Sequence, residues 1–156
     1  MASAKLKDLP TDTALYDEDF YAWTLGQAAE LRARRPAGLD WENLAEEIDD
    51  LGKSVFKELR AALRVIVTHM LKWDHQPERR SRSWVNSINT QRNDLEDVLS
   101  ENPSLRRRQN EALAKAYRNA RLDAATEMGR SERTLPETCP YSVDEILTRE
   151  FPWPEA

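Results

Sequence analysis

Hydrophobic residues recur along most of the chain at steps of three and four, which is the spacing of one face of an α-helix. The clearest stripe follows Asp40, a residue type that caps helix starts, and extends from Trp41 to Trp73. Its other members are Leu44, Ile48, Leu51, Val55, Leu59, Ala62, Ile66 and Met70. The stripe keeps its phase through Gly52, so the sequence predicts one continuous helix about 50 Å long.

Capping and breaking residues predict four further helices. The first begins near Asp17 and is stopped by Pro36 and Gly38, and the third is a short helix over about 84–99. The fourth opens at Asn102-Pro103 and ends at Gly129, with alanine at every fourth residue from Ala112 to Ala124. Ser142 and Glu145 form a capping-box pattern for a short fifth helix that ends before Pro152.

Only four glycines and few β-branched residues are present, which disfavours strands and their turns. We predict an all-α fold: an antiparallel bundle of four main helices, with a long central second helix and a short C-terminal helix. Residues 1–12 are predicted to be a flexible N-terminal segment, and residues 13–156 a single helical domain. The residues predicted to be buried are Trp23, Trp41, Leu51, Leu59, Ile66 and Trp73.

Composition and motif content indicate where the protein is expected to reside and which kinds of chemistry are disfavoured. The longest uncharged apolar stretch, 65–71, is far shorter than the roughly 20 residues of a membrane span, and no signal-peptide pattern is present. One cysteine, Cys139, excludes an internal disulfide and a thiolate cluster. Signatures of phosphate loops, metalloproteases and serine nucleophiles are absent. We therefore expect a cytoplasmic protein without a metal or cofactor, and a function that is not enzymatic.

Several segments together resemble one family. They are Asp19-Phe20-Tyr21-Ala22-Trp23, 40–48, Leu71-Lys72-Trp73, 76–84 and Thr138-Cys139-Pro140-Tyr141. The order resembles the bacterial family known as domain of unknown function number 29, from about Tyr16 to Phe151. The resemblance implies an all-α intracellular bacterial protein, and it transfers no catalytic residue.

The predicted turn between the second and third helices is basic and aromatic. Its candidate anion-binding residues are Lys72, Trp73, Arg79, Arg80, Arg82 and Trp84. Arginines beside the free amides of a helix start can bind phosphate or carboxylate groups. The favoured interpretation is structural: the three arginines pair with Asp74, Glu78 and the acidic start of the chain, while both tryptophans pack the end of the bundle.

Three other features have plainer interpretations. The acidic run Glu42, Glu46, Glu47, Asp49 and Asp50 has carboxylates that suit hard cations, but a solvated face or a docking surface for the arginines is favoured. His69 falls inside the apolar arc and is interpreted as a hydrogen-bonded core histidine. Cys139 is interpreted as a packed small residue.

Three functional classes remain open at this stage. A helical protein-interaction module that forms a homodimer is favoured, because small-residue ladders and a broad apolar stripe suit helix partners. Nucleic-acid binding through the basic turn is the alternative, although residues 1–50 hold 12 acids against 5 bases. A hydrolase or transferase using His69 or His75 ranks last, because no nucleophile accompanies them. No membrane partner is expected.

Overall fold

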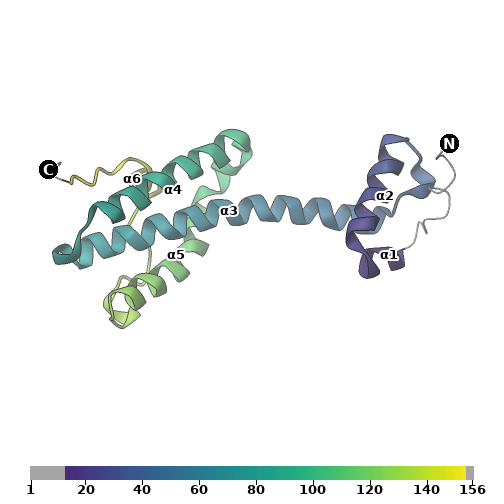
Figure 1. The fold of residues 1–156 in the computed structure, drawn as a ribbon. Coiled ribbons are helices and arrows are strands. Elements are labelled where there is room, and N and C mark those ends of the chain that lie inside the picture. Colours follow the sequence, from purple (N-terminus) through teal and green to yellow (C-terminus); the bar gives the residue numbers. More distant parts are fainter. Residues whose placement is uncertain (1–12, 154–156) are drawn as a thin grey trace. The chain divides into compact units, whose positions relative to one another are not determined.

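The computed structural model describes residues 13–153, and every regular element in this range is a helix (Figure 1). The α-helices are α1 (Thr13–Glu18), α2 (Phe20–Arg32), α3 (Trp41–His75), α4 (Arg82–Glu101), α5 (Gln109–Glu127) and α6 (Val143–Thr148). Short 3-10 helices lie between them: η1 (Pro36–Gly38), η2 (Pro77–Arg79), η3 (Pro103–Arg108) and η4 (Glu132–Thr134). The predicted all-α fold, with a long second main helix and a short C-terminal helix, is confirmed.

The described residues form two compact units, which divide between Lys53 and Ser54 within α3. The predicted flexible segment, residues 1–12, lies outside the described residues. The prediction of one domain over 13–156 stays a prediction. Within residues 13–153, no helix combines the length and the hydropathy that a membrane crossing requires.

The first unit contains α1, α2 and the start of α3. The first helix begins before the predicted Asp17, and Asp19 interrupts it, because its side chain accepts a hydrogen bond from the Ala22 amide at 2.9 Å and caps α2. Trp23 is buried, and its indole nitrogen donates to the Asp40 carboxylate at 3.2 Å. Gln27, also buried, accepts from the Asp40 amide at 2.8 Å. These contacts attach α2 to the start of α3.

Helix α3 has 35 residues and confirms the predicted long helix. Asp40 accepts a hydrogen bond from the Asn43 amide at 3.4 Å, as expected of a capping residue. Gly52 lies inside the helix without ending it. At about 1.5 Å per residue, the helix is about 50 Å long.

The second unit packs α4, α5 and α6 around the later part of α3 (Figure 1). Its most deeply buried large side chains are Leu59, Leu63, Ile66, Val67, Met70, Leu71, Ile88, Leu95, Leu99 and Ile146. The alanines at 112, 116, 120 and 124 are buried, which confirms close packing along that face of α5. At 20 residues, α4 is longer than the sequence predicted.

The ends of α5 and the start of α6 show how far local sequence signals predicted the remaining helix boundaries. Helix α5 begins later than expected, because 103–108 forms the 3-10 helix η3 first. Gly129 has a φ of 64°, the left-handed conformation that glycine adopts easily at a helix end. Ser142 and Glu145 form the predicted capping box at the start of α6.

The predicted core is right in the second unit and partly wrong in the first. Trp23, Leu59, Ile66 and Trp73 are buried. Trp41 and Leu51, however, are 62% and 66% exposed. Helices α1 and α2 bond to Glu47 in α3 and to Asp40 just before it, and the face with Trp41 stays uncovered within the described chain.

Candidate functional site

The turn between α3 and α4 holds Arg80 against the end of α3. The Arg80 Nε donates to the Trp73 carbonyl oxygen at 2.9 Å, and its guanidinium lies 4.8 Å from the Trp73 ring centroid. Trp73 is 5% exposed. Arg80 therefore satisfies one of the carbonyls that a helix end leaves without an intrahelical partner.

Lys72 is also engaged within the second unit. Its ammonium donates to the Glu127 carboxylate at 2.5 Å and lies 4.4 Å from the Trp84 ring centroid. Only 8% of the residue is exposed. Lys72 thus joins α3 to both α5 and α4, and its ammonium group is paired with the Glu127 carboxylate.

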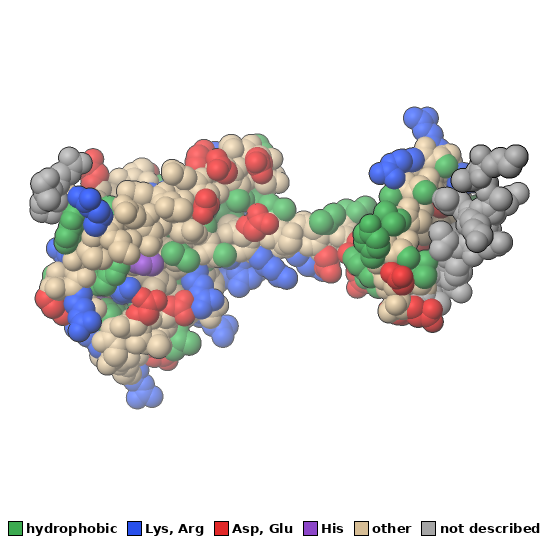
Figure 2. All heavy atoms as spheres, in the orientation of Figure 1, with side chains coloured by type: hydrophobic (Ala, Val, Ile, Leu, Met, Phe, Trp, Pro, Cys, Tyr) green, Lys and Arg blue, Asp and Glu red, His purple; other side chains and the backbone are tan. Residues whose placement is uncertain are grey.

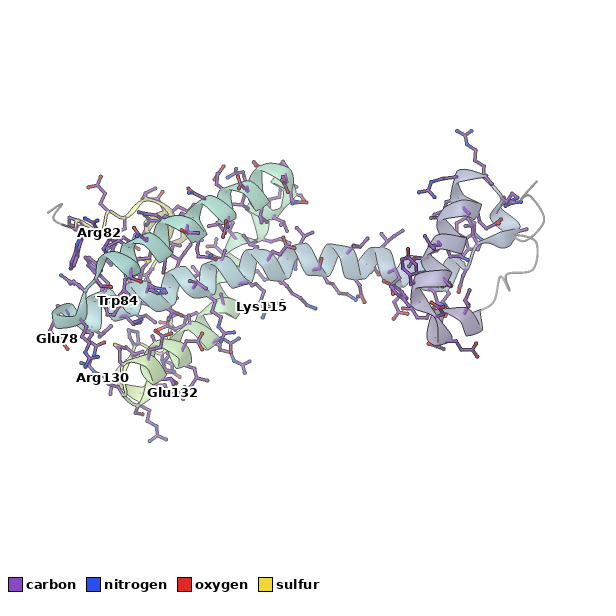
Figure 3. All side chains as sticks on the ribbon, viewed as in Figure 1. Glu78, Arg82, Trp84, Lys115, Arg130 and Glu132 are labelled. Carbon is purple, nitrogen blue, oxygen red and sulfur yellow. The ribbon has the colours of Figure 1, made fainter. Side chains whose placement is uncertain are left out.

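Arg79 and Arg82 are different, because both are exposed and their side chains make no hydrogen bond or ion pair within residues 13–153. Glu78 and Arg82 lie close to the turn, as Figure 3 shows. The expected ion pairs of these arginines with Asp74 and Glu78 do not form in the described structure. Arg79 and Arg82 thus keep guanidinium groups without a described partner, whereas Arg80, which is also exposed, has its Nε bonded to Trp73.

Asp74 forms an ion pair with Arg149, a partner that the sequence analysis did not predict. The two terminal nitrogens of Arg149 donate to its carboxylate at 2.6 and 2.9 Å, and the Tyr141 hydroxyl donates at 2.7 Å. Burial alone would raise the pKa of Asp74, but the hydrogen bonds from Arg149 and Tyr141 outweigh it and lower that pKa. Burial, followed by the bond to Asp74, raises the pKa of Tyr141.

The family model described as "Domain of unknown function DUF29" matches residues 15–152. The chain belongs to this family. No curated protein and no solved structure matches the chain.

Three of the segments that carried the resemblance to DUF29, at 71–73, 76–84 and 138–141, converge in the second unit. Lys72 contacts Trp84, Arg80 contacts Trp73, and Tyr141 reaches the carboxylate of Asp74. These contacts join the end of α3, the start of α4 and the segment before α6. These motif residues of the DUF29 chain thus have a packing role.

A cavity of about 690 Å³ lies beside α5 in the DUF29 chain, lined in part by Tyr117, Arg121 and Cys139. The Cys139 thiol donates to the Tyr141 carbonyl oxygen at 3.5 Å, and burial raises its pKa. Burial likewise raises the pKa of Tyr117, whose hydroxyl donates to the Pro136 carbonyl oxygen at 2.5 Å. A thiol that stays protonated is a weak nucleophile, so the predicted packing role of Cys139 fits its surroundings.

His69 and the acidic run make hydrogen bonds within the chain. The His69 Nδ1 lies 2.8 Å from the Val65 carbonyl oxygen within α3, so the histidine is hydrogen-bonded as predicted, although it is only half-buried. In the acidic run, Glu47 accepts a hydrogen bond from the Tyr16 hydroxyl. No group of three or more His, Cys, Asp or Glu side chains among residues 13–153 is arranged to hold a metal ion.

Exposed apolar side chains concentrate in the first unit of this DUF29 chain. Among the described residues, seven of the nine large hydrophobic side chains that are exposed belong to it: Phe20, Tyr21, Leu25, Leu31, Trp41, Ile48 and Leu51. The second unit has Leu122 and Trp153. Figure 2 shows hydrophobic side chains gathered over α2 and the adjoining stretch of α3. This surface is the second candidate site. The sequence analysis did not locate it, because it predicted Trp41 and Leu51 to be buried.

Proposed function

We propose that this DUF29 chain is a helical protein-interaction module that associates with a second copy of itself through the apolar face of its first unit. The exposed apolar side chains in 20–51 are the observation that carries the proposal. Trp41 is 62% exposed and Ile48 is 67% exposed, and their spacing of seven residues places them on one face of α3. Tyr21 and Leu25, four residues apart, share a face of α2.

The apolar area of these exposed side chains favours association. Each large apolar side chain that passes from water into an interface contributes on the order of 1.5–3 kcal/mol. Monomeric soluble proteins rarely expose contiguous apolar patches beyond a few hundred Å², and larger patches mark sites of association. An aromatic residue such as Trp41 is also the type that most often dominates the free energy of an interface.

The test is the mass in solution, measured by light scattering and sedimentation over a wide concentration range. The wild-type protein should approach twice the chain mass of 18.1 kDa. Ile48→Glu should shift the protein toward a single chain, because the interface would have to bury an unpaired carboxylate. Leu122→Glu is the matched control, since Leu122 is 51% exposed in the second unit. A wild-type protein that stays at the mass of one chain at every concentration would contradict the proposal.

A second candidate function is anion binding by Arg79 and Arg82. It is supported by the lack of an acidic partner for either side chain among the described residues, while the nearby Asp74 is bound by Arg149. Guanidinium groups recognise phosphate and carboxylate oxygens through charge-assisted hydrogen bonds. Phosphate should raise the melting temperature of the wild-type protein relative to chloride at equal ionic strength.

The double variant Arg79→Ala/Arg82→Ala should lose that stabilisation by phosphate. Its matched control is Arg118→Ala/Arg133→Ala, which removes the same charge from exposed positions elsewhere in the second unit. If phosphate stabilises both variants equally, the effect does not come from the turn.

A further inference from the structure

We infer that the surface that receives the first unit is a basic groove between α3 and α5 of the second copy. This inference rests on the proposed self-association and identifies its other half. The groove has a volume of about 580 Å³. We call it the basic groove and define it by its lining residues, which are Lys57, Arg60, Ala61, Arg64, Val65, Ala116, Asn119 and Asp123.

The lining of the groove combines small or apolar residues, here called its floor, with cationic side chains. Ala61, Val65 and Ala116 supply small or apolar surface that a partner side chain can cover. Lys57, Arg60 and Arg64 recur at steps of three and four, so they lie on one face of α3.

The cations of the basic groove are only partly neutralised within their own chain. Arg64 forms a two-pronged ion pair with Asp123, at 2.5 and 2.8 Å. Lys57 and Arg60 form no hydrogen bond or ion pair with another described residue, and the Arg60 Nε is shielded from water without a partner. Like charges on one helix face repel each other, so this face favours an acidic partner.

The first unit has the complementary pattern. Its described residues, 13–53, contain ten acidic and four basic residues, whereas residues 54–153 contain 15 acidic and 17 basic residues. On α3, Glu42, Glu46 and Asp49 are exposed and recur at steps of four and three. The apolar residues Trp41, Ala45 and Ile48 precede them and lie roughly 100° around the helix axis, so an acidic row and an apolar row run side by side. This acidic apolar face of the first unit therefore offers both anions and hydrophobic surface to one partner.

A second copy of this chain supplies both surfaces at once. The exposed ring of Trp41 and the side chain of Ile48 would cover the floor of the groove, and the neighbouring carboxylates would meet Lys57 and Arg60. In a two-fold dimer such a contact occurs twice, so each favourable charge pair is doubled. Complementary charge also selects the partner, because like-charged surfaces repel each other at close range.

A charge-swap experiment tests the inference. The face variant is Glu42→Lys/Glu46→Lys, and the groove variant is Lys57→Glu/Arg60→Glu. Each variant alone should dimerise about tenfold or more weakly than the wild-type protein, because like charges would face each other in its homodimer. An equimolar mixture should recover the wild-type affinity, since each reversed face then meets a groove of opposite charge. Sedimentation of the single variants and of the mixture measures this recovery.

Two controls keep the outcome clear. Circular dichroism verifies that each variant keeps its helical content. The second control repeats the mixing experiment with two single variants, Glu46→Lys and Lys57→Glu, which change only exposed positions and leave Arg60 in place. Added salt should weaken the wild-type dimer, because it screens exposed charges.

The failures of the two proposals are distinguishable. If Ile48→Glu disrupts the dimer but the groove variant dimerises as the wild-type protein does, the apolar face is an interface and the basic groove is not its receptor. A groove variant that loses binding of a single-stranded oligonucleotide while its dimerisation is unchanged would also overturn the inference, in favour of a nucleic-acid surface. A mixture that fails to recover affinity, although both variants are folded, would overturn it directly.

Discussion

Asp74 accepts both terminal nitrogens of Arg149, at 2.6 and 2.9 Å, although 75 residues separate the two in sequence. The pair joins the end of α3 to the segment after α6, and the Tyr141 hydroxyl binds the same carboxylate. Both charged side chains are about one-third exposed. The ion pair is therefore more buried than a typical surface pair but not fully shielded from water. Its contribution to the free energy of unfolding can be measured.

Replacing Arg149 should destabilise the second unit. In Arg149→Met the partly buried Asp74 keeps only the Tyr141 hydroxyl as a side-chain partner, so we expect the free energy of unfolding to fall by about 1–3 kcal/mol. Urea denaturation measures the change. Arg133→Met, at an exposed arginine, should stay within about 0.5 kcal/mol of the wild-type value. Equal effects of the two substitutions would contradict a specific role for the ion pair.

The lowered pKa of Asp74 predicts a pH dependence of stability. Because the folded-state pKa lies below that of the unfolded chain, this contribution is present above the ordinary carboxyl pKa. It is lost as the pH falls through the folded-state value. Below about pH 4, the wild-type protein should therefore lose stability more steeply than Asp74→Asn. Urea titrations at a series of pH values compare the slopes, and parallel slopes would rule out this linkage.

The buried part of the long stripe should be sensitive to truncation. Ile66 is fully buried, so Ile66→Ala should lower the free energy of unfolding by about 2–5 kcal/mol through lost burial and a cavity. Leu122→Ala, at a side chain that is 51% exposed, should change it by less than about 0.5 kcal/mol. Thermal and urea unfolding of the two variants provide the comparison. A loss below about 1 kcal/mol for Ile66→Ala would mean that the core repacks around the missing atoms.

The two neighbouring arginines of the turn should differ in their effect on stability. Arg80→Ala removes a hydrogen bond to the Trp73 carbonyl and a contact with the Trp73 ring, so a loss of about 1–2 kcal/mol is expected. Arg79→Ala removes an exposed side chain without such contacts and should stay within about 0.5 kcal/mol of the wild-type value. Chemical denaturation of both variants tests the difference, and a larger loss for Arg79→Ala would reverse the assignment.

The sequence alone determined the helices, because the signals that start and stop a helix act over a few neighbouring residues. Asp40 and Ser142 cap the helices that their positions predicted, and Gly129 ends α5. The unbroken phase of apolar residues indicated that α3 continues through Gly52. The start predicted at Asp17 was misplaced, because Asp19 offers the same capping chemistry two residues later. The start of α5 was also misplaced, because η3 precedes it.

Only the tertiary structure decided which parts of these helices are covered and which charges are paired. Ile48 and Ile66 belong to one stripe, yet Ile48 is 67% exposed and Ile66 is buried, because burial depends on which elements pack beside each turn of the helix. Asp74 bonds to Arg149 instead of the arginines next to it in sequence. Periodicity reports the conformation of a segment, whereas coverage and ion pairing depend on residues far along the chain that only folding brings together.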